Sequence, residues 1–179
     1  MPVQEMWERF QLRGGEAPAS GRGCDAEPSR GFFTSAFCRS CGLCCRATEM
    51  ILLRKDVERL ERLGYRRGDF AVESGGFARL RNVDGYCYFY DKATGLCRVY
   101  EHRPLGCRLY PLVFDEARGV LLDPECPLSS FFAEDCSCLR AALPVLRSVL
   151  EALGEEYGVR YDERVFEQSS KKLLSSCRP

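Results

Sequence analysis

The chain has 179 residues, and its 26 basic and 26 acidic side chains give a formal net charge of zero. This length fits one domain with a modest core, and the balanced charge removes any general electrostatic case for binding nucleic acid or an anionic membrane. The N-terminus lacks a basic stretch followed by an apolar one, and no apolar run approaches the roughly 20 residues that span a bilayer. We therefore expect a cytoplasmic protein.

Residues 1–36 are expected to form an irregular N-terminal extension, because Gly14-Gly15, Pro18 and Pro28 interrupt every helical or strand pattern. Cys24 lies alone in this extension and is interpreted as a spare thiol. The sequence predicts a cysteine-cluster metal-binding domain at 37–128 and C-terminal helices at 129–179 that pack on the same domain.

Cysteine is the unusual component, since the chain has twelve cysteines and a single histidine. Four of them, Cys38, Cys41, Cys44 and Cys45, fall within eight residues. Disulfides are the alternative, but reducing compartments keep thiols reduced, except in hyperthermophiles. Short C-x-x-C steps let successive thiolates converge on one cation or cluster. The spacing therefore favours a metal site built on sulfur.

The next segment alternates short elements. Residues 49–54 resemble a strand, and residues 55–63 are predicted to be a helix with Val57, Leu60 and Leu63 on one face and Gly64 at its end. Residues 65–84 are expected to be loop and strand, with a turn at two consecutive glycines.

Residues 86–90 and 96–100 are rich in β-formers and predict a hairpin with a five-residue loop at 91–95. Side chains alternate along a strand, so we expect Cys87 and Cys97 to meet across this hairpin. Residues 101–110 are predicted to be a helical turn that ends before Pro111.

Residues 112–122 predict a second hairpin, and residues 133–153 and 162–174 predict two amphipathic helices. Pro144 is expected to kink the first helix, and Asp162 is expected to cap the second. These elements indicate the α+β class: a small single domain in which metal-centred loops and β-hairpins are flanked by helices.

Besides Cys24, three cysteines lie outside the dense run and its partners. Cys136 and Cys138 form a C-x-C step at the start of the long helix, and extra ligands, a redox pair and semi-buried structural thiols stay open as alternatives. Cys177 is expected to be a free thiol on a mobile tail.

Three stretches together carry a resemblance: FCRSCGLCCR at 37–46, GYCYFYDKATGLCRVYEHRPLGCRLYP at 85–111, and Cys126-Pro127. They resemble the CxxCxxCC cysteine-cluster family, also called the YkgJ-like family, a zinc- or iron-chelating domain. The resemblance implies eight metal-ligating cysteines: Cys38, Cys41, Cys44, Cys45, Cys87, Cys97, Cys107 and Cys126. One group of members methylates flagellin lysines, and we do not carry that activity over to this chain.

Eight thiolates suit two four-sulfur sites or one larger cluster, and sulfur ligation accepts both iron–sulfur and zinc. The dense run, in which a further cysteine follows C-x-x-C-x-x-C at once, and the proline after Cys126 are similar to ferredoxin-type segments. We therefore expect an iron–sulfur cluster, with zinc as the alternative.

Arginines surround the cysteines in the sequence. Arg46, Arg103 and Arg108 are candidate cofactor-binding residues, because guanidinium groups can offset the negative charge of a thiolate site and donate hydrogen bonds to sulfur. Ordinary surface arginines are the alternative, and this is the preferred interpretation of Arg39 and Arg98. The sequence identifies no catalytic residue, and His102 is interpreted as solvent-facing.

Three functions fit these features. The first is a metal-binding module with a redox or metal-handling role, whose ligands are metal ions. The second is a cluster-dependent enzyme that modifies a protein or RNA, for example by a methyltransferase-like activity, and it requires a pocket beside the cluster. The third is a redox-sensing regulator that binds a partner protein through its C-terminal helices. We expect no membrane partner.

Overall fold

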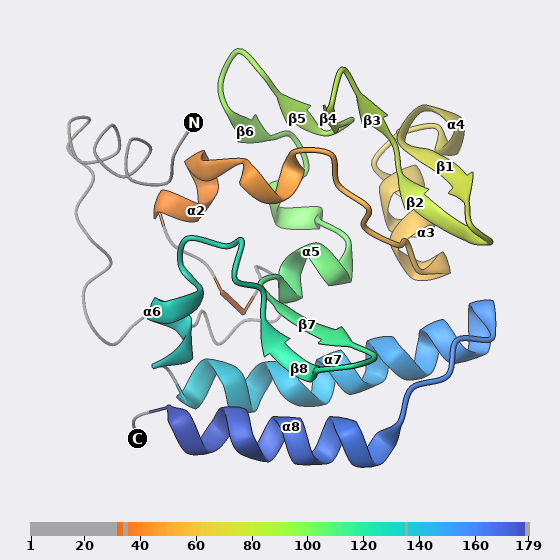
Figure 1. Ribbon diagram of the computed structural model, residues 1–179. Helices are drawn as coiled ribbons and strands as arrows, with labels where there is room; N and C mark the ends of the chain where they lie inside the picture. Colours follow the sequence, from red (N-terminus) through yellow and green to blue (C-terminus); the bar gives the residue numbers. More distant parts are fainter. Residues whose placement is uncertain (1–31, 34–35, 135, 178–179) are drawn as a thin grey trace.

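The computed structural model describes residues 32–33, 36–134 and 136–177 and has the α+β fold predicted from the sequence (Figure 1). Its elements in chain order are α2 (Ala36–Cys41), η1 (Leu43–Cys45), α3 (Arg54–Arg62), α4 (Arg67–Phe70), β1 (Ala71–Ser74), β2 (Phe77–Leu80), β3 (Asn82–Val83), β4 (Tyr86–Cys87), β5 (Tyr90–Asp91), β6 (Leu96–Cys97), η2 (Tyr100–His102), α5 (Leu105–Leu109), β7 (Leu112–Asp115), β8 (Gly119–Leu122), α6 (Ser129–Ala133), α7 (Cys136–Tyr157) and α8 (Glu163–Ser176).

The described strands pair as four antiparallel hairpins, β1–β2, β3–β4, β5–β6 and β7–β8. Figure 1 shows α7 and α8 side by side along one edge of the molecule, with the first three hairpins at the opposite edge and α5 and β7–β8 between them. In the described part of the chain, no helix is both long and apolar enough to cross a membrane.

Two apolar clusters form the interior. The larger one, called here the α7 core, contains the buried leucine stripe of α7 together with aromatic residues from α2, α6 and α8. The smaller one, called the α3 core, surrounds α3 and the first three hairpins. Their main members are Phe33, Phe37, Phe132, Leu139, Leu143, Leu146, Leu150 and Phe166 in the α7 core, and Leu52, Leu60, Phe70, Phe89 and Val99 in the α3 core.

The predicted helix at 55–63 is confirmed as α3, and Val57 and Leu60 are buried as expected. The placement of Leu63 was wrong, because its side chain is 43% exposed. The helix ends at Arg62, and Gly64 then takes a φ of +92°, which turns the chain away from the core. The expected strand at 49–54 is also wrong: only Ile51 forms an isolated bridge there.

The hairpin expected between residues 86–90 and 96–100 is replaced by two tighter ones. Tyr90 lies opposite Cys97 in β5–β6, whereas Cys87 lies opposite Asn82 in β3–β4. The cause is local turn chemistry. The Asp91 carboxylate accepts hydrogen bonds from the Ala93 amide and the Thr94 hydroxyl, both at 2.9 Å, which starts the turn at residue 91.

The C-terminal half follows the sequence pattern closely. The hairpin at 112–122 is confirmed as β7–β8, and the two long helices are confirmed as α7 and α8. Asp162 caps α8, since its carboxylate accepts from the amides of Arg164 at 2.8 Å and Val165 at 3.3 Å.

The expectation for Cys177 was wrong. Cys177 forms a disulfide with Cys136, with the Cα atoms 5.4 Å apart. Both residues are nearly buried in the α7 core, which holds the end of α8 against the start of α7. Cys138 is also buried there, while Cys24 lies outside the described residues.

Candidate metal centre

The eight cysteines of the motif come from segments that are far apart in the sequence. Two lie in α2, two in η1, and one each in β4, β6, α5 and the loop before α6. Figure 1 shows α2, η1, β6 and α5 running close together on one side of α7. In that order of segments, the residues are Cys38, Cys41, Cys44, Cys45, Cys87, Cys97, Cys107 and Cys126.

Gly42 gives the dense run its shape. α2 ends at Cys41, Gly42 takes a left-handed conformation with φ +66°, and η1 begins at the next residue. A Cβ atom at position 42 would lie 2.6 Å from the Tyr90 ring, so only glycine fits both the backbone angle and the space. The Cys45 amide donates to the Gly42 carbonyl at 3.1 Å, which closes the turn.

Cys44 lies in the middle of the set. Burial is the main cause that raises the pKa of six of the other cysteines, and the charge of Cys44 raises each of these pKa values further. For the seventh, Cys45, a hydrogen bond to Cys44 is the main cause. Since thiolates act on one another in this way at short range, all eight sulfurs share one region.

The other seven cysteines divide between the two cores. Cys38, Cys41 and Cys126 pack against the α7 core. The remaining four belong to the α3 core: Cys45, Cys87, Cys97 and Cys107. Cys44 itself is exposed and lies in neither cluster. We call these sets the α7-core group and the α3-core group.

The neighbouring thiols Cys44 and Cys45 have pKa values that are shifted in opposite directions. The Cys45 thiol donates a hydrogen bond that lowers the pKa of Cys44 to about 7, and Arg103 also favours the Cys44 thiolate. The same hydrogen bond and burial raise the pKa of Cys45. Cys44 is therefore the cysteine of this pair that ionises first and is ready to bind a cation.

Arg103 supplies the main positive charge at the site. It is buried, and it opposes the burial-driven rise in pKa at Cys38, Cys97 and Cys107. Arg46 acts on Cys41 in the same direction. Arg108 lies instead beside Arg59 and Arg103, and its own pKa is lowered by burial and by these two cations.

The two arginines interpreted as surface residues are held on the surface. Arg39 forms an ion pair with Glu101 at 3.2 Å, and its guanidinium lies 4.5 Å from the centre of the Tyr100 ring. Arg98 donates to the Tyr88 carbonyl and lies over the Tyr88 ring. Neither pairing requires a cofactor. His102 is exposed, in agreement with its interpretation as solvent-facing.

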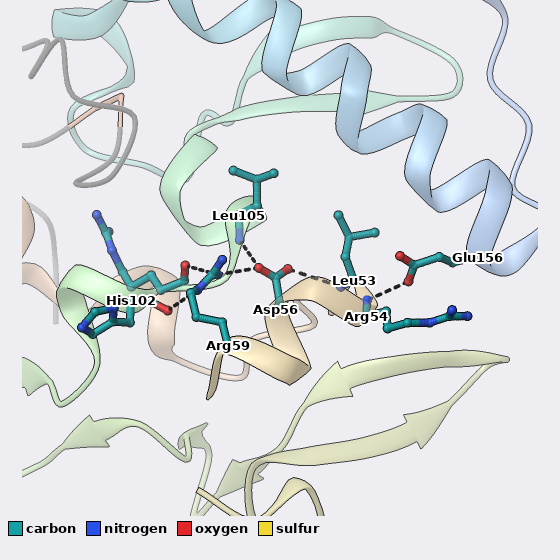
Figure 2. A network of polar contacts seen from close by, with 8 residues as sticks. Leu53, Arg54, Asp56, Arg59, His102, Leu105 and Glu156 are labelled. Atoms are coloured by element: carbon teal, nitrogen blue, oxygen red, sulfur yellow. Dashed lines mark hydrogen bonds and ion pairs between the residues drawn. The ribbon is translucent and has the colours of Figure 1, made fainter. Parts of the chain in front are cut away.

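A polar clamp fixes the segment that carries Arg103 and Cys107 (Figure 2). Asp56, only 2% exposed, accepts from Arg59 at 2.6 Å and from the Leu105 amide at 3.0 Å. Arg59 in turn donates to the Arg103 carbonyl at 2.8 Å and to the His102 carbonyl at 3.3 Å. The clamp therefore joins α3 to the start of α5.

Tyrosine rings enclose the centre. Tyr86 and Tyr90 stack with centroids 5.0 Å apart, and Tyr90 also covers Gly42. The Arg103 guanidinium lies 3.9 Å from the centroid of Tyr100, and burial raises the pKa of Tyr100 to about 12. Apolar ring surface beside a metal site is expected to limit the access of water to it.

A cavity of about 730 Å³ adjoins the cysteines. Cys44 and the whole α3-core group line one part of it, together with Arg103 and Asp56. Its opposite wall is apolar and comes from α7: Leu146, Val149, Leu150 and Leu153. Arg103 from the turn at 101–103 lines the cavity, whereas His102, Cys136 and Cys138 are not among its lining residues.

The donor set suits iron and zinc alike, because it is made of thiols in a region of positive charge. A zinc ion holds its sulfurs about 2.3 Å from itself, so they crowd around one point. Among the residues that the structure describes, no three Cys, His, Asp or Glu side chains are arranged to hold one ion in this way. Five of the eight cysteines line the cavity, and Cys38, Cys41 and Cys126 are not among its lining residues.

Two features of the centre were not predicted. No role for Asp56 was predicted, although an acidic residue at the third position of a helix is a known capping signal. The Cys136–Cys177 disulfide was missed because the two residues are 41 positions apart and no pattern links them.

The fold and this centre define a small α+β protein with a sulfur-rich metal site. The chain belongs to the CxxCxxCC family, described as "Putative zinc- or iron-chelating domain", whose model matches residues 37–127. A relative from Methanocaldococcus jannaschii, "Uncharacterized protein MJ0661", is 30% identical over a region that covers 76% of this chain and 79% of the relative. No solved structure matches the chain significantly.

Proposed function

We propose that this protein holds iron–sulfur clusters on eight cysteines, in two sites of four, for a redox or metal-handling role. The α3-core group forms the first site: Cys45, Cys87, Cys97 and Cys107. Cys44 joins the α7-core group to form the second: Cys38, Cys41, Cys44 and Cys126.

The division of the cysteines between two cores is the observation that carries the proposal. Each core supplies a separate set of apolar neighbours, and the charge of Cys44 acts on cysteines of both sets. Since three cysteines pack on one side and four on the other, assigning Cys44 to the smaller set gives each site the four thiolates that a cluster takes.

The sequence supports iron–sulfur over zinc, because the dense run of cysteines at 38–45 and the proline after Cys126 are similar to ferredoxin-type segments. Five of the eight cysteines border the cavity. Arg103 and Arg46 would offset the negative charge of the loaded sites.

Purification without oxygen, followed by absorption spectroscopy and analysis of iron, sulfide and zinc, tests the proposal. Two four-iron clusters would give a brown protein with about eight iron atoms and as many sulfides per chain. A colourless protein with stoichiometric zinc would contradict it and would make the metal structural.

Single substitutions test the division into two sites. We expect Cys97→Ala and Cys126→Ala each to remove about half of the iron, because each takes one ligand from a different four-cysteine site. Cys138→Ala is the matched control, since Cys138 is a buried cysteine outside both groups. Complete loss in both ligand variants would instead indicate one shared cluster.

The cavity favours a second candidate, a cluster-dependent enzyme. Its apolar wall on α7 and its polar groups Arg103 and Asp56 are typical of a small-molecule site. For the methyltransferase-like version, the test is calorimetric titration of the loaded protein with S-adenosylmethionine. Saturable binding that Leu150→Trp abolishes would support an enzyme, and the absence of binding would argue against this version.

A further inference from the structure

The Cys136–Cys177 disulfide closes one end of the α7–α8 hairpin. α7 begins at Cys136, and Cys177 follows directly after α8. Figure 1 shows the start of α7 next to the end of α8. The covalent link therefore holds the ends of the two helices together at a point where the chain itself does not connect them.

The other polar anchors of α8 lie nearer to its start. Ser169 Oγ accepts from the Val120 amide at 2.8 Å, and Arg147 pairs with Glu163 and Glu167. Past Ser169, Leu173 and Leu174 pack on the α7 core, Ser170 is buried with no hydrogen bond to its Oγ from the described residues, and Cys177 is the covalent anchor. Breaking the disulfide would thus loosen the last turns of α8 and leave the rest of the helix in place.

The disulfide and the α7-core group of cysteines share one set of neighbours. Cys136, Cys177 and the α6 residue Phe132 are members of the α7 core, and Cys38 and Cys126 pack against it. The chain also passes from Cys126 through α6 directly to Cys136. A displacement of Cys136 would therefore shift the cysteines of the second proposed metal site, both through shared packing in the α7 core and through the backbone of α6.

We propose that the Cys136–Cys177 disulfide is a redox clasp: its reduction weakens the retention of metal by the site of Cys38, Cys41, Cys44 and Cys126. This inference rests on the proposed function above. A dithiol reductant would supply two electrons and two protons. The S–S bond breaks, Cys136 and Cys177 become thiols, and the dithiol becomes a disulfide. Each of the two cysteines is 9% exposed, so the bond lies at the edge of the core, where a reductant can reach it after slight fraying.

Metal release from the loaded protein tests the clasp. A water-soluble phosphine reduces the disulfide without competing for metal as a thiol would, and its oxide takes the oxygen atom of water. A chelator is then added, and released iron and zinc are followed over time. We expect the metal of one site to leave about tenfold faster after reduction, a change worth about 1.4 kcal/mol, while the other site is unaffected.

The double variant Cys136→Ser/Cys177→Ser should release metal as the reduced protein does, with or without phosphine. Cys138→Ala keeps the clasp and should behave as the unaltered chain. Mass analysis after alkylation confirms that reduction exposes two further thiols, so the test on the unaltered chain stands even if the double variant folds poorly. Equal release rates before and after reduction would overturn the clasp, whereas a chain that binds no metal at the outset would overturn the proposed function itself.

Discussion

At the scale of single residues, Asp56 joins α3 to the segment that carries the proposed ligand Cys107. Besides Arg59 and the Leu105 amide, its carboxylate accepts from the Leu53 amide at 3.3 Å. It therefore caps α3 and holds the start of α5, which carries Cys107, with one side chain. Removing this carboxylate would leave the amides of Leu53 and Leu105 without their side-chain acceptor.

We expect Asp56→Asn to destabilise the loaded protein by about 2 kcal/mol, because an amide has one acceptor oxygen where the carboxylate has two. This loss corresponds to a fall in Tm of about 4–8 °C in a thermal unfolding experiment. Glu58→Gln on the exposed face of the same helix is the control and should leave Tm unchanged. Equal effects of the two changes would show that the clamp does not hold the site.

Gly42 and Gly75 have similar φ angles but different surroundings, so they can be compared to separate crowding from backbone strain. Gly42→Ala must place a side chain at φ +66° and against Tyr90, whereas Gly75→Ala meets a similar φ of +61° with nothing within 4 Å. The backbone cost, about 1 kcal/mol, is common to both variants, and the crowding at Tyr90 adds about 1–3 kcal/mol to the first alone. Denaturant unfolding measures this difference.

The two glycine variants should also differ in metal content. Gly42→Ala is expected to lower the metal per chain, because it shifts the turn that carries Cys44 and Cys45, while Gly75→Ala should retain the full amount. If both variants kept their metal, the turn at Gly42 would not be needed to place the ligands.

At the scale of elements, periodic segments could be predicted from the sequence and irregular ones could not. α7 buries four leucines at helical spacing, α3 buries Val57 and Leu60, and α8 buries Phe166. In these helices the tertiary packing agrees with the local apolar pattern. The pairing of Cys87 and Cys97 failed because both strands are only two residues long and their register depends on turns at Asp84-Gly85 and Asp91.

The candidate site shows the same contrast. The resemblance to the cysteine-cluster family identified the eight candidate cysteines, but their division between two cores depends on which element each segment packs against. The Cys136–Cys177 bridge depends on the docking of α8, which no local pattern encodes. The features that could not be predicted from the sequence are therefore those that depend on long-range packing.

The Ser169 hydroxyl forms a hydrogen bond that links α8 to β8. Ser169→Ala would leave the Val120 amide without its acceptor, and we expect a loss of about 1 kcal/mol in the free energy of unfolding. Ser175→Ala is the control, because its hydroxyl bonds to the Lys172 carbonyl on the exposed side of α8. A loss of equal size in both variants would contradict a specific role for Ser169.

At the scale of the whole molecule, the two cores depend on metal to different degrees. The α3 core is the smaller one, it includes four of the proposed ligands, and its hairpins β3–β4 and β5–β6 have strands of two residues each. The α7 core has two long helices and a disulfide besides its ligands. Metal binding should therefore contribute more to the folding of the first core than of the second.

We expect removal of the metal to unfold the α3 core while α7 and α8 stay folded. Hydrogen exchange followed by mass spectrometry, before and after chelation, measures this directly. Amides of β1 to α5 should lose protection, and those of α7 and α8 should keep most of theirs, because their helical hydrogen bonds and leucine stripe do not involve the ligands. Uniform loss of protection would mean that the cores fold as one unit, and no loss in either would mean that the cysteines do not hold the fold together.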